Sequence, residues 1–162
     1  MLNMQDTKNQ NLLLHGSNVV VECPKIRIEG HYKDFGYGFY CTKLEIQARR
    51  WALTRHPQHI INVYSYAPST DLAVMSFPEM TEEWLDFVTD CRRGVEHLYD
   101  VVEGPMADDQ VWDYVEDFAK GEISREAFWA LVKFKHPTHQ IVFCTEKALS
   151  CLAFVRYYSI EK

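Results

Sequence analysis

Residues 34–51 read Asp-Phe-Gly-Tyr-Gly-Phe-Tyr-Cys-Thr-Lys-Leu-Glu-Ile-Gln-Ala-Arg-Arg-Trp, and this stretch decides the fold that the sequence predicts. Its two glycines, Gly36 and Gly38, flank a single aromatic residue. Glycine at such positions permits a positive φ or lets another backbone or a ligand come close. The aromatic segment 39–41 is typical of a short strand. We therefore expect a strand whose central ring, Tyr40, has an open approach.

A helix is expected directly after this strand. Thr42 and Glu45 have the Thr-x-x-Glu spacing of a capping box, which predicts a helix that starts at once. The helix should end near Pro57, because a residue before proline is disfavoured in the α conformation. This arrangement would bring Trp51 close enough to Tyr40 to flank one pocket. The apolar face of the helix consists of Leu44, Ala48, Trp51 and Ala52.

A second motif, Leu14-His15-Gly16-Ser17, lies upstream at the end of a short predicted strand, residues 11–15. This motif, followed by Gly38-Phe39-Tyr40 and by Trp51 on a helix, resembles the ADP-ribosyltransferase superfamily. The branch in question is the one shared by diphtheria-like toxins and poly-ADP-ribose polymerases. The resemblance implies an α+β fold with split antiparallel sheets and short flanking helices. It also implies NAD+ as co-substrate and a macromolecular acceptor, either protein or nucleic acid.

The same resemblance assigns roles within the expected NAD+ site, where Ser17 could reach the nicotinamide ribose. His15 would hydrogen-bond the adenosine ribose, and the backbone of Gly16 would pair with the carboxamide, so a side chain there would obstruct it. Tyr40 would stack on the nicotinamide ring. The residues expected to bind the co-substrate are His15, Gly16, Ser17, Tyr37, Gly38, Tyr40 and Trp51.

The third catalytic position of the superfamily departs from the usual pattern. Active relatives start the late strand with Glu, whereas the corresponding strand here starts with Gln140. A Gln carbonyl can still accept a hydrogen bond from a ribose hydroxyl, but it carries no charge. Gln140 is consistent with three kinds of protein. These are a slow or target-dependent transferase, a transferase that uses another base, and an NAD+-binding or protein-interaction module without turnover. The acids Glu29, Asp34 and Glu146 are not favoured as substitutes, because each lies on a different element.

The sequence is most similar to an uncharacterised bacterial family within this superfamily. That family combines the motifs above with Gly-Pro-x-Ala-Asp, here residues 104–108, and with a late Gln-Ile-x-Phe-x-Thr-x-x-Ala-Leu, here residues 140–149. The resemblance runs from about residue 12 to residue 154. It implies a toxin or defence component with a small antitoxin-like protein partner.

Composition is consistent with a single domain. The chain has 162 residues, 47% apolar and 25% charged, with a net charge of −6 that argues against strong non-specific binding to nucleic acid. We expect a frayed tail at residues 1–10 and one domain at residues 11–162. No run is long and apolar enough to span a membrane, and the five cysteines form no Cys-x-x-Cys pair. These features favour the cytoplasm.

Further elements follow from caps and alternation. Strands are predicted at 19–22, 60–66, 72–77, 99–102, 140–144 and 154–160, with 60–66 and 72–77 forming a hairpin. Thr81, Ser124 and Thr145 should each cap a helix, and another should start at Asp108 or Asp109.

Two alternatives compete with an NAD+ site. His-x-x-His occurs at residues 56–59 and 136–139, and four imidazoles could hold a transition metal, although proline-containing turns lack the geometry of a helical pair. The acids around Glu116 and Asp117 are interpreted as a solvated helix face, with contact to a basic partner as the alternative. We expect no metal and favour the NAD+ site.

Overall fold

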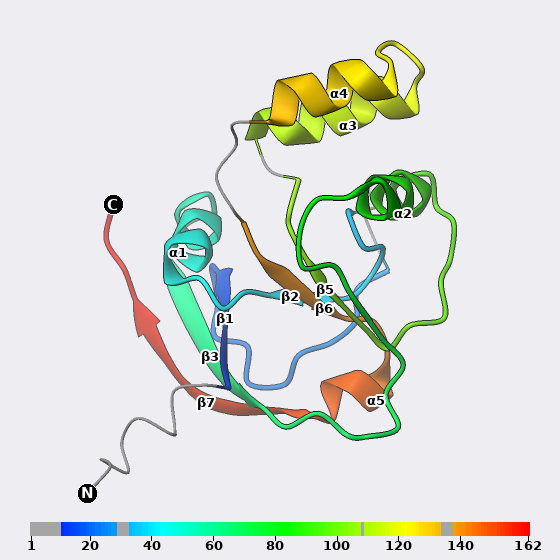
Figure 1. Ribbon diagram of the computed structural model, residues 1–162. Coiled ribbons are helices and arrows are strands. Elements are labelled where there is room, and N and C mark those ends of the chain that lie inside the picture. The colour runs from blue at the N-terminus through cyan, green and yellow to red at the C-terminus, as the bar shows by residue number, and fades with distance from the viewer. Residues whose placement is uncertain (1–10, 29–32, 108, 134–137) are drawn as a thin grey trace, which may run out of the picture.

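The computed structural model describes residues 11–28, 33–107, 109–133 and 138–162, which form a mixed α+β structure with two sheets and five helices (Figure 1). One sheet has the order β1-β3-β7 and the other β2-β6-β5-β4. Within these ranges, one bridge between Leu14 and Thr42 connects them. The strands are β1 (Leu12–Ser17), β2 (Phe39–Cys41), β3 (Ile60–Tyr66), β4 (Val74–Ser76), β5 (Val101–Gly104), β6 (Gln140–Phe143) and β7 (Leu152–Ser159).

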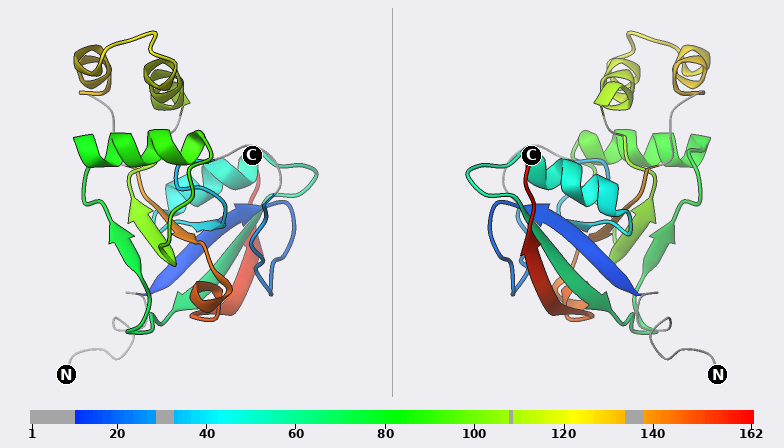
Figure 2. Two further views of the ribbon diagram at one scale, coloured as in Figure 1. Left: turned by 90° about the vertical axis from the view of Figure 1, so that its right-hand side faces the viewer. Right: turned by 90° about the vertical axis from the view of Figure 1, so that its left-hand side faces the viewer.

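The helices are placed unevenly on the two sheets. Helix α1 (Glu45–Leu53) packs against β1 and β3, and α2 (Glu82–Arg92) lies between the four-stranded sheet and the pair formed by α3 (Asp109–Ala119) and α4 (Arg125–Val132), as Figures 1 and 2 show. Helix α5 (Glu146–Leu149) follows β6 directly. None of the helices in the described ranges has the length and apolar character needed to cross a bilayer.

Local signals predicted most elements correctly. Thr81, Ser124 and Thr145 each accept a hydrogen bond from the backbone N–H three residues later, as N-caps do. Strand 60–66 has the predicted bounds, and β7 lies at the edge of its sheet. The proposed 1–10 tail falls outside the described residues.

The predicted hairpin between residues 60–66 and 72–77 is wrong. β4 lies in the other sheet and pairs with β5 in parallel, so the sheets are not purely antiparallel as expected. The chain is guided there by hydrogen bonds from Ala73 N to the Asp100 carboxylate and from Phe77 N to Glu103 O, both 2.8 Å. These contacts are distant in sequence, so alternation alone does not reveal them.

Two further local predictions are also wrong. Residues 19–22 form no strand, because the buried side chain of Asn62 bonds Val21 N and Val19 O in place of a neighbouring strand. The Thr42–Glu45 capping box does not form either. Leu44 occupies the N-cap position of α1 without a side-chain bond, and the Thr42 hydroxyl accepts from Leu44 N.

Candidate functional site

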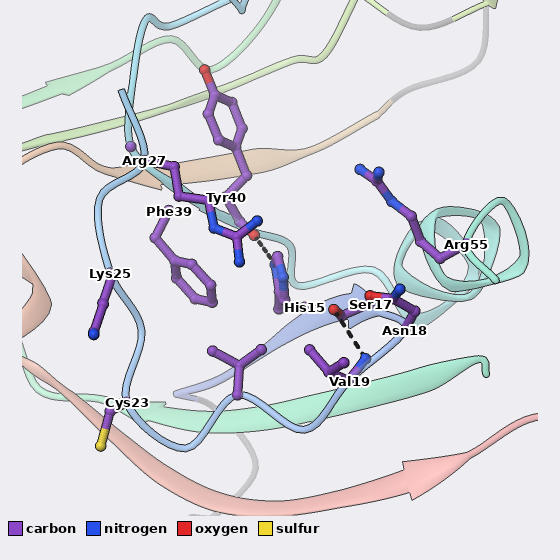
Figure 3. Close-up of a pocket in the computed structure, with 13 residues that line it drawn as sticks. His15, Ser17, Asn18, Val19, Cys23, Lys25, Arg27, Phe39, Tyr40 and Arg55 are labelled. Carbon is purple, nitrogen blue, oxygen red and sulfur yellow. Dashed lines mark hydrogen bonds between the residues drawn. The ribbon is translucent and has the colours of Figure 1, made fainter. Parts of the chain in front are cut away.

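A cavity of about 440 Å³ opens where β1 and β2 diverge beyond the Leu14–Thr42 bridge (Figure 3). Its wall is formed by the end of β1, by β2, by the segment that follows β1 and by Arg55, just after α1. A smaller hollow of about 150 Å³ adjoins it and shares His15, Gly16, Tyr40 and Arg55. The larger cavity is lined by His15, Gly16, Ser17, Gly38 and Tyr40 among the predicted residues, and the smaller hollow adds Trp51 and Gln140.

His15 is held as a neutral imidazole with a defined tautomer. Its Nδ1 lies 2.6 Å from the carbonyl oxygen of Tyr40, and because a carbonyl only accepts, Nδ1 carries the proton. Nε2 is then an acceptor. The ring packs on Phe39 at 4.3 Å between centroids. Burial, assisted by the nearby cations Lys33 and Arg55, lowers the pKa of His15 to about 4, so the ring stays uncharged at neutral pH.

Tyr40 directs its ring away from His15, and its hydroxyl is anchored at the far end (Figure 3). The hydroxyl donates to Gly36 O at 2.5 Å and accepts from Phe35 N at 3.2 Å. Burial raises the pKa of Tyr40 well above its ordinary value, so the hydroxyl remains a donor. The ammonium of Lys33 lies 4.9 Å from the ring centroid, which shows that a cation can sit on this ring.

Gly36 and Gly38 are required for the expected reasons, a positive φ and a close backbone contact, whereas Gly16 is required for a different one. A Cβ on Gly16 would lie 2.2 Å from Ala48 O in α1, so the absence of a side chain permits close packing of strand and helix rather than clearance for a ligand. A Cβ on Gly38 would meet Phe143 O at 2.7 Å. Gly36 has a φ of +81°, which favours glycine.

The backbone of Gly16 nevertheless remains available to a ligand. Leu14 exchanges both of its main-chain hydrogen bonds with Thr42. Polar groups two residues apart in a strand point to the same edge, so the N–H and C=O of Gly16 point away from β3. Beyond the Leu14–Thr42 bridge, β2 no longer pairs with that edge.

Three cations on the cavity wall were not identified from the sequence. Arg27 and Arg55 approach His15 from opposite sides, and Lys25 lies further along the segment that carries Arg27 (Figure 3). None of the three forms an ion pair with another described residue. The available signal was the seven basic residues among positions 25–55, in a chain that is acidic overall. Such a wall favours an anionic ligand.

Tyr37 does not join the site. It lines a separate hollow of about 340 Å³ with His97, Leu98 and Cys144. Tyr37 therefore does not line the cavity expected to hold the co-substrate, because Tyr37 and Phe39, on either side of Gly38, line different hollows.

Gln140 is 2% exposed and its amide nitrogen lies 3.2 Å from Asp34 Oδ2 and 3.5 Å from Pro105 O. Asp34 is itself buried and forms an ion pair with Arg92, 2.6 Å from Arg92 Nη2 to Oδ1. From the sequence, Asp34 was considered only as a substitute for the catalytic Glu and was not favoured. Its partners Arg92 and Gln140 are 58 and 106 residues away in the sequence, so no local pattern predicts these contacts.

The histidine pairs form no metal centre in the described residues. The rings of His56 and His59 lie 5.6 Å apart, and His59 Nδ1 bonds Ala52 O. His139 uses both nitrogens: Nδ1 accepts from Lys43 N, and Nε2 donates to Glu103 at 2.8 Å. That bond, together with the Lys43 ammonium, lowers the pKa of Glu103 to about 2. His136 lies outside the described residues.

Comparison with known proteins places the chain in a family. No curated protein matches it, and no solved structure matches it. A sequence model of the family described as "Protein of unknown function (DUF3990)" matches residues 12–154. That range includes the His15 motif, the Tyr40 strand and the Gln140 strand. Because the match spans most of its length, the chain belongs to the DUF3990 family.

Proposed function

We propose that the protein binds NAD+ in the cavity between β1 and β2 and transfers ADP-ribose to a macromolecular acceptor, on an ADP-ribosyltransferase-like fold. One observation carries this proposal: a neutral His15, Tyr40 and the cations Lys25, Arg27 and Arg55 line one cavity. Its volume of about 440 Å³ lies in the range of small-molecule sites. A dinucleotide offers sugar hydroxyls, an aromatic cation and two phosphates, which match these three kinds of group.

Each group has a role in this proposal. His15 Nε2 accepts a hydrogen bond from a ribose hydroxyl, because Nδ1 is committed to Tyr40 O. The N–H and C=O of Gly16 pair with the carboxamide. The nicotinamide ring of NAD+ is a cation and takes the place of the Lys33 ammonium on the face of Tyr40. Arg27 and Arg55 bind the phosphates.

The proposed reaction breaks the bond between the ribose C1′ and the nicotinamide nitrogen, and the electron pair leaves with nicotinamide. The acceptor's nucleophile then forms the new bond at C1′ and loses its proton to solvent or to a base on the acceptor. Positive charge develops on the ribose as the bond breaks. Gln140 can only place its carbonyl dipole against this charge, whereas a Glu would place a full negative charge there. Transfer is therefore expected to be slow.

Gln140 also favours a second function, a catalytically inactive module that binds NAD+ or another nucleotide, or that uses the cavity for a protein partner. In that case the cavity selects the ligand but does not cleave it. For the active form, the proposed setting is a toxin or defence system with a small antitoxin-like partner.

Labelled NAD+ mixed with the purified chain and cell lysate tests the first function. We expect label on a macromolecule, and we expect His15→Ala and Tyr40→Ala to abolish it. His56→Ala is the matched control, because His56 is exposed and lines neither cavity. Lysate that stays unlabelled with folded wild-type protein contradicts a transferase. Calorimetry then separates the two functions: NAD+ binding without nicotinamide release supports the inactive module, and no binding removes the transferase and the NAD+-binding form of the module.

A further inference from the structure

Asp34 is a buried anion whose two carboxylate oxygens both accept hydrogen bonds, and it contacts Gln140, which lines the smaller hollow. Its side chain is 4% exposed. Oδ1 accepts from Arg92 Nε at 3.0 Å and from Arg92 Nη2 at 2.6 Å, and Oδ2 accepts from Ala107 N at 2.8 Å and from Gln140 Nε2 at 3.2 Å. Arg92 is fixed in turn by Trp112, whose ring it stacks on at 3.6 Å and whose carbonyl it bonds. This carboxylate therefore has a single fixed orientation.

The orientation of the Gln140 amide follows from its neighbours. The Asp34 carboxylate and the Pro105 carbonyl are both acceptors, so only the NH₂ end of the amide can face them. The carbonyl oxygen is the polar atom of Gln140 that is left to face a ligand. Gln140 lines the smaller hollow together with His15, Tyr40 and Trp51. A ligand in this hollow would therefore meet an acceptor at residue 140.

We propose that Asp34 is a positioning residue, which locks the Gln140 amide so that its carbonyl oxygen accepts a hydroxyl of the bound co-substrate. This rests on the proposed NAD+ function. The Asp34 charge also polarises the amide, since hydrogen bonds in a chain strengthen one another. The side-chain amide of residue 140 donates directly to the buried Asp34 carboxylate, and this contact explains why residue 140 is not Glu. A carboxylate at residue 140 would meet the Asp34 carboxylate at hydrogen-bonding distance, where like charges repel.

Asp34→Asn removes the carboxylate that accepts from the Gln140 amide and keeps the shape of the side chain. The Asn carbonyl still accepts from Arg92, so its NH₂ group faces the donors Ala107 N and Gln140 Nε2, and the Gln140 amide loses the acceptor that held it. The two ligands to compare by calorimetry are NAD+ and ADP, because ADP lacks the nicotinamide ribose. We expect Asp34→Asn to weaken NAD+ binding about tenfold, which corresponds to about 1.4 kcal/mol, and to change ADP binding less than about twofold.

Two further variants complete the test. Gln140→Leu removes the acceptor directly and should reproduce the selective loss of NAD+ affinity even if Asp34→Asn does not fold. Asp100→Asn is the matched control: Asp100 also accepts a backbone N–H and a hydroxyl, but lines neither cavity, so both affinities should stay at the wild-type value. Wild-type affinity for NAD+ in Gln140→Leu, or equal losses for NAD+ and ADP, overturns the inference alone. A folded wild-type chain that binds no NAD+ overturns the inference and the proposed function together.

Discussion

The charges on the wall of the large cavity and the charges behind Gln140 are arranged in opposite ways. On the wall, Lys25, Arg27 and Arg55 form no ion pair within the described part of the chain. Behind Gln140, Asp34 and Arg92 are almost fully buried, 4% and 3% exposed, and each is bonded by several groups. The two regions meet at the smaller hollow, which Arg55 and Gln140 both line.

This difference separates two uses of charge. A buried ion pair costs desolvation and is retained where every donor and acceptor is satisfied, so it fixes positions within the fold. Neighbouring cations repel one another, and the pKa of Lys33 is lowered by burial and by Arg55 and Arg27. An anion that binds at this wall reduces the repulsion between the cations. We therefore expect the buried pair to determine stability and the wall to determine affinity.

The largest expected effect comes from breaking the buried pair. Arg92→Met leaves Asp34 as an uncompensated buried charge, which typically costs about 3–5 kcal/mol. The free energy of unfolding, measured by urea denaturation, should fall by this amount. Arg125→Met removes an exposed pair with Glu82 and Asp86 and should have a much smaller effect. Equal losses in the two variants would contradict the structural role of the Asp34–Arg92 pair.

The second prediction concerns His15, which borders the cation wall. Its folded pKa of about 4 lies below the unfolded value of 6.5, so the unfolded chain binds more protons between these pH values. The stabilising contribution is complete above pH 6.5 and is lost as the pH falls toward 4, by about 3 kcal/mol in total. In His15→Gln this component should be absent. Parallel pH profiles of unfolding free energy for the two proteins would show that His15 titrates normally.

The smallest effect on the fold is expected from the wall itself. Arg27→Ala and Arg55→Ala should each weaken ADP binding about tenfold, because each removes a charge-assisted hydrogen bond. Unfolding free energy should stay within about 0.5 kcal/mol of wild type. Arg156→Ala on the exposed face of β7 is the control and should bind ADP normally. Wild-type affinity in both cavity variants, by calorimetry at low salt, would remove the wall as the anion site.

Sequence reasoning succeeded where the determining contact is local. The caps Thr81, Ser124 and Thr145 each bond a backbone N–H three residues away, so the pattern contains the whole interaction. Thr42 has the same spacing to an acid but fails as a cap, because its hydroxyl is used by Leu44 N and lies 3.4 Å from His139. His139, 97 positions away, thus takes part in an interaction that the local Thr-x-x-Glu pattern does not reveal.

The candidate site divides in the same way. The two motifs brought His15, Gly16, Ser17, Gly38 and Tyr40 to one cavity, with Trp51 and Gln140 beside it. Asp34 lies at the start of the decisive stretch, but from the sequence it was considered only as a catalytic acid and was not favoured. Its importance depends on Arg92, Ala107 and Gln140, which converge on it only in three dimensions.

The close contact between Gly16 and α1 has a practical consequence for anyone who reshapes this cavity. Main chain rests on main chain there, so the spacing between strand and helix has no side chain that could be trimmed or enlarged to adjust it. A side chain added at Gly16 would push β1 away from α1 and would displace the imidazole of His15. Redesign of ligand preference is therefore safer from the opposite wall, residues 18–27, where the chain follows neither a helix nor a strand.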